Sequence, residues 1–138
     1  MPIAYLTRKE RFNSAHKLWV HEWDEAKNKE VFGKCANSNW HGHNYLLEVT
    51  VRGQPDPQTG FIIDAKKLSQ IIKEEIIEHL DHMNLNLDVP FIPKNIQPTT
   101  ENLVILIWNQ LELKISGCKL FRIKLQETET ISAEYYGE

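Results

Sequence analysis

The order of the predicted elements indicates an α+β fold, in which an antiparallel sheet is covered on one face by two helices. Strand patterns occupy both ends of the chain, and two consecutive helical patterns lie in the middle, in the order β-β-α-α-β-β. Outer strands around a central helical pair are typical of α+β domains. With 138 residues and no linker or repeat, the chain is predicted to form a single domain over residues 1–138.

The first half of the chain predicts two strands. Residues 3–12 are extended in character although heavily charged, and residues 21–34 are polar and predict a helical turn or a long loop. From His43 onward apolar and polar residues alternate, which predicts a half-buried strand. A turn cluster at residues 53–60 ends it. The side chains expected on its buried face are Tyr45, Leu47, Val49 and Val51.

The two helices are predicted from capping residues and periodicity. Asp64 is suited to the N-cap of an amphipathic helix over residues 65–80. After an Asn-, Asp- and Pro-rich loop at 81–98, Thr99 or Thr100 caps a second helix that runs to about Lys114. This second helix is apolar nearly all round, so we expect it to be well buried. Its apolar residues are Leu103, Val104, Ile105, Leu106, Ile107, Trp108 and Leu111.

Two short strands close the predicted fold. They cover residues 119–127 and 131–136 and are joined by the turn Thr128-Glu129-Thr130. Alternation in the first of them places Phe121, Ile123 and Leu125 on the inner face.

Composition excludes several classes of function. Hydrophobic residues make up 41% and charged residues 25%, as in ordinary globular proteins. The net charge of −3 without a basic block argues against a nucleic-acid partner. No apolar run approaches the roughly 18–20 residues that span a membrane. With two cysteines and no secretion signal, we expect a cytoplasmic protein.

Three histidines predict a metal site. His41 and His43 are two positions apart, so on a strand both imidazoles point to one face, and His16 ends the earlier strand. Three imidazole ligands with a fourth position open are typical of catalytic zinc. Nickel, iron and copper remain open on ligand type alone. His21 and His79 lack this context and are expected to face solvent.

Two cysteines invite different interpretations. Cys35 lies in a polar run six residues before His41, where it is either an adventitious loop thiol or a base or nucleophile beside cationic neighbours. Cys118 follows Gly117 at the start of a strand and fits an inert, small hydrophobic role.

Acidic residues add two further candidates. Asp81 and His82 follow the first helix; if they hydrogen-bond, Asp81 would orient His82 as in an acid–base dyad. Glu127 shares the parity of the inward residues of its strand, unless that strand ends at residue 126 and leaves Glu127 exposed. A carboxylate at the edge of a core needs a partner. Two parallel N–H donors would suit it, and pterins and guanines present such an edge.

These segments together resemble the 6-pyruvoyltetrahydropterin synthase family, which includes the bacterial 6-carboxytetrahydropterin synthases of the queuosine pathway. The resemblance spans nearly the whole chain and keeps the order of the family's motifs. The segments that carry it are His16, residues 35–45 (CANSNWHGHNY), residues 80–85 (LDHMNL), residues 99–102 (TTEN) and residues 126–128 (QET).

The resemblance implies the tunnelling fold, in which three subunits join their sheets into a barrel and two trimers stack as a homohexamer. It also implies 7,8-dihydroneopterin triphosphate as substrate and Zn²⁺ as Lewis acid. By resemblance, zinc is held by His16, His41 and His43. Cys35 would accept a proton, Asp81 and His82 would form a relay supplied by a neighbouring subunit, and Glu127 would anchor the pterin and take part in the relay. Thr99, Thr100 and Glu101 would complete the pterin pocket.

The product remains open between two family branches. Five residues separate Cys35 from His41, a longer spacing that favours the pyruvoyl-forming type over the carboxy-forming type, as does the long 17–34 segment. Two other hypotheses stand beside the lyase. One is a non-catalytic pterin- or purine-binding protein with a structural metal, and the other is an aldolase or cyclohydrolase of the same fold.

Overall fold

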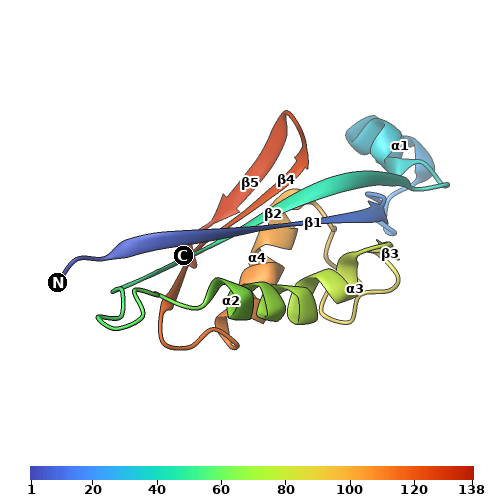
Figure 1. Ribbon diagram of the computed structural model, residues 1–138. Helices are drawn as coiled ribbons and strands as arrows, with labels where there is room; N and C mark the ends of the chain where they lie inside the picture. Colours follow the sequence, from blue (N-terminus) through green and yellow to red (C-terminus); the bar gives the residue numbers. More distant parts are fainter.

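A five-stranded sheet with helices on one face forms the framework of the computed structural model, which describes residues 1–138 (Figure 1). The strand order is β3-β1-β2-β4-β5. The α+β prediction is confirmed, with one difference in the sheet. A short strand that the sequence did not predict pairs in parallel with β1 at Ser14 and Ala15, so the sheet is mixed. The strands are β1 (Ala4–His16), β2 (His41–Gly53), β3 (Met83–Asn84), β4 (Lys119–Thr128) and β5 (Ile131–Tyr135).

Strands β1 and β2 form a long antiparallel pair that carries most of the candidate site. Each strand has 13 residues, and the ladder is unbroken from Ala4 opposite Gly53 to His16 opposite His41. The predicted strand at 3–12 therefore continues to His16, and the second strand begins at His41 rather than at His43. The chain between them leaves and returns at the same end of the ladder.

The segment between β1 and β2 contains the helical turn that its polar composition predicted. Helix α1 (Glu25–Phe32) begins after Asp24, whose carboxylate accepts a hydrogen bond from the Lys27 N–H at 2.7 Å. A turn of 3₁₀ helix, Gly33–Ala36, follows it and carries Cys35. Figure 1 places α1 at one end of the sheet, beyond the ends of β1 and β2.

The predicted helix at 65–80 is present in three consecutive parts. Asp64 is its N-cap, as expected, and accepts from the Lys66 N–H at 2.9 Å. The parts are α2 (Ala65–Ile72), a π-helical turn (Lys73–Ile77) and α3 (Glu78–Leu80). Helix α4 (Thr100–Glu112) begins after Thr99, whose hydroxyl accepts from the Asn102 N–H at 3.2 Å. Thr99 is therefore the cap and Thr100 the first helical residue.

The hydrophobic core lies between the sheet and these helices. Helix α2 contacts β1, and α4 contacts β4 and β5, so both cover the same face (Figure 1). Each fully buried aliphatic side chain stabilises the fold by about 1.5–3 kcal/mol relative to exposure. The predicted inner face of β2 is confirmed as buried. Core residues from sheet and helices include Tyr45, Leu47, Val49, Val51, Leu68, Ile72, Ile76, Leu80, Leu103, Ile107, Leu111, Ile123 and Leu125.

Two expectations about burial are wrong in detail. Helix α4 is not buried all round, since Ile105 is 39% exposed; the helix lies on the outside of a two-layer fold. Phe121 was expected to face inward, but it is half-buried and packs on the exposed ring of Tyr5, with centroids 4.7 Å apart. A β-bulge shifts the register between Thr50 and Val51, and Leu120 packs against the core instead.

No helix of the structure has the length and apolar character required to cross a membrane.

Candidate metal and pterin site

The three predicted histidines meet at one end of the β1–β2 ladder. His16 lies directly opposite His41, and His43 lies opposite Ser14, two positions along the same face. The ring centroids of His16 are 4.5 Å from His41 and 5.1 Å from His43, and those of His41 and His43 are 4.9 Å apart. One nitrogen from each ring lies within 4.8 Å of the other two. Strand register alone therefore gathers the trio.

Hydrogen bonding leaves the buried nitrogens of this cluster free to bind a cation. His16 is 2% exposed, and its Nδ1 lies 2.8 Å from the Pro98 carbonyl oxygen. Because a carbonyl only accepts, Nδ1–H must donate, which leaves the lone pair of the neutral ring on Nε2. His16 Nε2 and His41 Nδ1 are buried without a hydrogen-bond partner. Such orphaned nitrogens, with one ring oriented by a carbonyl, fit a metal ligand set.

Burial favours the neutral form of two of these rings, against the opposing effect of the Glu127 carboxylate. Burial lowers the pKa of His16, and the nearby His41 and His43 act in the same direction, while the hydrogen bond to Pro98 and the Glu127 carboxylate oppose the shift. Burial also lowers the pKa of His41, and His43 acts in the same direction. The neutral imidazole is the form that binds metals. The residues present therefore fit a divalent cation held by nitrogen.

Glu127 lies against the histidines. Its Oε1 is 3.6 Å from Nε2 of both His16 and His43, and its side chain is 16% exposed. Strand β4 continues to Thr128, and the register between β4 and β5 shifts between Gln126 and Thr128. The alternative of an exposed strand end is therefore wrong. Glu127 adds a carboxylate at the edge of the cluster.

Tyr45 lines the inner side of the same cluster. Its ring centroid is 5.7 Å from that of His43, and its hydroxyl is buried without a partner. Burial, and then the Glu127 carboxylate, raises the pKa of the Tyr45 hydroxyl. The sequence analysis placed Tyr45 in the core only, although strand parity puts it on the same face as His41 and His43.

One pocket joins the histidines to most of the other predicted residues. It measures about 630 Å³. Cys35 is half-buried in its wall, and its carbonyl accepts a hydrogen bond from the Leu18 N–H at 2.7 Å. The predicted residues on its wall are His16, Cys35, His41, His43, Thr99, Thr100, Glu101 and Glu127. Wall residues that sequence reasoning missed are Leu18, Lys34, Asn37, Gly42, Thr128 and Ile131.

Asp81 and His82 form the expected pair, but His82 lines a different pocket from the histidine cluster's and Asp81 lines neither. Asp81 Oδ2 is 3.0 Å from His82 Nδ1, and Asp81 Oδ1 accepts from the Asn13 N–H at 3.0 Å. The Asn13 N–H, ahead of other causes, lowers the pKa of Asp81. His82 has φ 61° and a side chain that is 75% exposed.

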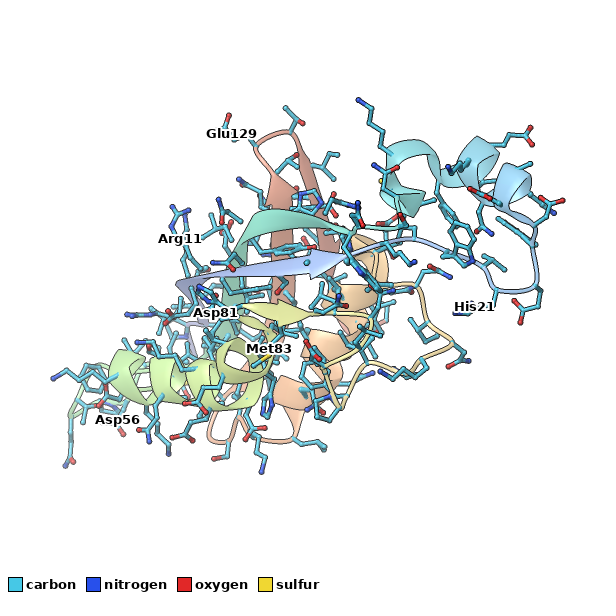
Figure 2. All side chains as sticks on the ribbon, turned by 90° about the vertical axis from the view of Figure 1, so that its right-hand side faces the viewer. Arg11, His21, Asp56, Asp81, Met83 and Glu129 are labelled. Atoms are coloured by element: carbon cyan, nitrogen blue, oxygen red, sulfur yellow. The ribbon has the colours of Figure 1, made fainter.

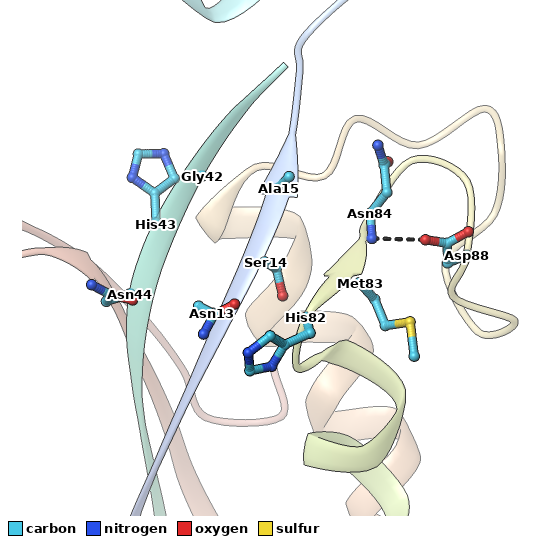
Figure 3. Close-up of a pocket in the computed structure, with 10 residues that line it drawn as sticks. All are labelled: Asn13, Ser14, Ala15, Gly42, His43, Asn44, His82, Met83, Asn84 and Asp88. Atoms are coloured by element: carbon cyan, nitrogen blue, oxygen red, sulfur yellow. Dashed lines mark hydrogen bonds between the residues drawn. The ribbon is translucent and has the colours of Figure 1, made fainter. Parts of the chain in front are cut away.

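This second pocket measures about 610 Å³ and opens along the outer part of β1. Figure 3 shows His82 beside Asn13 and Met83, with β1 between it and His43. Within one chain, the acid–base pair therefore does not share a pocket with Cys35.

The remaining histidines and the second cysteine stand apart. His21 and His79 are exposed, as predicted, and His21 lies in the loop before α1 (Figure 2). Cys118 is half-buried, and burial raises the pKa of its thiol. This agrees with the unreactive role expected for it.

Comparison with known proteins places the whole chain in one family. The model of the family described as 6-pyruvoyl tetrahydropterin synthase matches residues 5–138. The 6-pyruvoyl tetrahydrobiopterin synthase of Dictyostelium discoideum is 43% identical, over 96% of this chain and 96% of that protein. The protein of the same name from Drosophila melanogaster is 41% identical, over 99% of this chain and 81% of that protein. A more distant relative, a dihydroneopterin monophosphate aldolase from Pyrococcus furiosus, is 30% identical over 89% of each chain.

Comparison of structures gives the same result. The solved structure of the Caenorhabditis elegans 6-pyruvoyl tetrahydropterin synthase superposes with a TM-score of 0.92 at 37% identity, covering 100% of this chain and 98% of that one. The resemblance identified from the motifs is thereby confirmed, together with the expected fold. The chain belongs to the 6-pyruvoyl tetrahydropterin synthase family of enzymes.

Proposed function

We propose that this protein is a zinc-dependent lyase that converts 7,8-dihydroneopterin triphosphate to 6-pyruvoyltetrahydropterin and releases triphosphate. The observation that carries the proposal is one pocket in which three converging histidines, a thiol and a carboxylate face the same space. The names of the relatives at 41–43% identity support the same reaction.

His16, His41 and His43 would hold the zinc ion, since their orphaned nitrogens fit it. When bound there, zinc supplies Lewis-acid polarisation of the hydroxyl groups on the substrate side chain. The Pro98 carbonyl holds the His16 ring in one tautomer. Hydrogen-bonded ligands of this kind keep the orientation that binding requires.

The other groups of the pocket would move protons and hold the ring. Cys35 would take a proton from a side-chain carbon of the substrate, because its thiol lines the same pocket as the histidines. Glu127 would accept hydrogen bonds from the two parallel N–H groups of the pterin edge. Thr99, Thr100 and Glu101, at the start of α4, would complete the pterin pocket.

The proposed reaction balances without an external reductant. The C=N bond of the dihydropterin ring gains the two hydrogens that one side-chain carbinol loses on becoming a carbonyl. The second carbinol carbon loses a proton as triphosphate leaves the neighbouring carbon with its bonding electron pair, and the resulting enol takes up a proton at that carbon to become a methyl ketone. The protein must therefore shuttle protons between the side chain and the ring, which requires at least one base near each.

The second proton carrier would come from a neighbouring subunit. Asp81 Oδ2 lies 3.0 Å from His82 Nδ1, but His82 lines a different pocket from Cys35. We infer a homohexamer built as a dimer of trimers, whose sheets form a barrel. The outer side of β5, and that of β1 before Asn13, carry no strand partner and support this assembly, since exposed strand edges favour pairing with another sheet. The two free cysteines fit a reducing, cytoplasmic compartment.

Two related reactions remain as outcomes to be distinguished. A 6-carboxytetrahydropterin synthase would act on the same substrate and also release acetaldehyde. An aldolase acting on a dihydroneopterin phosphate is the second candidate, because the Pyrococcus furiosus relative is a dihydroneopterin monophosphate aldolase. A pterin-binding protein with a structural metal would need neither Cys35 nor the Asp81–His82 pair.

The test is to incubate the zinc-loaded protein with 7,8-dihydroneopterin triphosphate and to identify the products by mass spectrometry. Triphosphate and 6-pyruvoyltetrahydropterin, with no acetaldehyde, are expected. Acetaldehyde would move the protein to the carboxy-forming reaction, and glycolaldehyde derivatives would indicate an aldolase. Absence of every modified pterin at full zinc loading would refute the lyase.

A further inference from the structure

A short extended segment after His16 is held by side-chain amides instead of by a neighbouring strand. The Lys17 N–H donates to Asn86 Oδ1 at 3.0 Å, and Asn86 Nδ2 donates back to the Lys17 carbonyl at 3.0 Å. Two residues later, the Trp19 N–H donates to Gln97 Oε1 at 3.1 Å, and Gln97 Nε2 donates to the Trp19 carbonyl at 2.7 Å. Each amide supplies one donor and one acceptor, as a paired strand would.

We call each of these two-way pairings, at Lys17 and at Trp19, a clamp. Leu18, the residue between the two clamps, is hydrogen-bonded to Cys35. Backbone groups of successive residues in an extended chain point to opposite sides. The backbone N–H and C=O of Leu18 therefore point away from the two amides, and the N–H donates to the Cys35 carbonyl at 2.7 Å. On this second side a third amide, that of the buried Asn28 in α1, pairs with Val20 in both directions at 2.7 and 3.0 Å.

The Gln97 clamp also adjoins the histidine cluster. Gln97 precedes Pro98, whose carbonyl holds His16, and the Gln97 carbonyl accepts from Asn102 Nδ2 at 2.9 Å and from the Thr99 N–H at 2.8 Å. The dipeptide Gln97-Pro98 thus holds two places: the Pro98 carbonyl orients the His16 ring, and the Gln97 side chain binds the backbone of Trp19. The start of α4 is tied to the same point.

We propose that Gln97 and Asn86 are positioning residues that set the place of Cys35 in the pocket, acting through residues 17–19. This inference rests on the proposed function, because it assumes that the rate of the reaction depends on the position of the Cys35 thiol. The 3₁₀ turn that carries Cys35 has no strand partner. Its Leu18–Cys35 hydrogen bond ties this turn to the segment that follows β1, and the two clamps hold that segment in place.

The test uses isosteric variants that keep the acceptor and remove the donor. In Gln97→Glu, the carboxylate still accepts from the Trp19 N–H but cannot donate to the Trp19 carbonyl. Asn86→Asp makes the same change at Lys17. Gln54→Glu, in the exposed turn after β2, adds the same charge and serves as the matched control. All variants carry Cys118→Ser, so that Cys35 is the one thiol.

Three measurements test successive steps of the inference, from the hydrogen bond of Leu18 to the catalysed reaction. Amide hydrogen exchange at Leu18 measures the bond to Cys35, iodoacetamide alkylation measures the access of the thiol, and kcat with KM measures the reaction. In Gln97→Glu we expect Leu18 exchange to be about tenfold faster, alkylation to change by about threefold or more, and kcat to fall by about tenfold with KM within about twofold. Zinc content and circular dichroism should match the control.

Several results would overturn the inference. Leu18 exchange and Cys35 alkylation equal to those of the control, in a folded variant, would show that the clamps do not hold Cys35. Faster exchange with unchanged kcat would show that the position of the thiol does not matter. Loss of zinc in Gln97→Glu would place the effect on His16 instead.

The inference and the proposed function can fail separately. If the parent protein has no lyase activity, the proposed function fails, while exchange and alkylation still decide whether the amides hold Cys35. If Gln97→Glu does not fold, Asn86→Asp, which acts on Lys17 just before Leu18 in the chain, gives the same test.

Discussion

Replacing His43 by alanine should abolish tight zinc binding while leaving the fold intact. The ring of His43 is half-buried at the edge of the cluster and is not part of the hydrophobic core, so the fold should tolerate its removal. The variant retains only His16 and His41, whose ring centroids are 4.5 Å apart. Structural zinc sites with four ligands bind with about 10–16 kcal/mol, so one ligand contributes roughly 3 kcal/mol. We therefore expect about a 100-fold loss of affinity.

The assay combines a chelator competition titration with thermal unfolding. At free zinc about 100 times the dissociation constant of the parent protein, binding stabilises the fold by about 2.7 kcal/mol, but by only about 0.4 kcal/mol in His43→Ala. At about 4 °C per kcal/mol, these energies correspond to shifts of about 10 °C and about 2 °C.

His21→Ala, a change of the same kind in an exposed loop residue, is the control and should behave as the parent protein. A zinc affinity of His43→Ala within about threefold of the parent value would refute a site built on these three rings.

Cys35→Ala should lower kcat by about 10²–10⁴-fold with zinc content unchanged, because a proton carrier is lost; loss of zinc would make Cys35 a ligand instead, and Cys118→Ala is the control. Glu127→Gln should lower kcat/KM by roughly 10–100-fold, as expected for losing a charged hydrogen-bond acceptor; an unchanged ratio would contradict its proposed role toward the pterin. Gly137→Ala should destabilise the fold by at least about 1 kcal/mol, since Gly137 has φ 81° and an added Cβ would overlap the Trp108 ring at Cζ2; denaturant unfolding followed by tryptophan fluorescence measures this, and an unchanged midpoint would count against it. Burial raises the pKa of the Cys118 thiol, so its alkylation should rise only at a pH above that of an exposed thiol, which mass spectrometry across a pH series can establish.

Patterns that repeat along the chain made most of the fold predictable. Alternation in β2 is a property of a whole segment, so this strand was found with the correct buried face. The amphipathic helix at 65–80 was likewise found, since its pattern also covers a whole segment. The two-residue β3 is too short to form a pattern, and it was missed. Phe121 was misplaced because a β-bulge reverses parity without any mark in the sequence.

The site was predictable where its residues come from regular strands. His16, His41 and His43 were found because strand parity and an antiparallel ladder suffice to bring them together. Asp81 and His82 were correctly paired, but one sequence cannot say which pocket a loop will face.

The sequence analysis assigned no role to the side-chain amides of Asn28, Asn86 and Gln97. They bond to the backbone of residues 17, 19 and 20 from distant positions, and such bonds leave no spacing to recognise. Loop segments held in this way are visible only in three dimensions.

Because β1 and β2 pair without interruption, the number of residues in each strand determines whether the three histidines of the candidate metal site meet. Removing a single residue anywhere from Tyr45 to Val51 would shift the strand by one place, and the imidazoles of His41 and His43 would turn to the opposite side of the sheet from His16. Removing two residues would restore the side but carry both rings about 6–7 Å along the ladder. Insertions and deletions can therefore accumulate in the turn after β2, whereas a change of length within either strand would separate the three imidazoles of the candidate metal site.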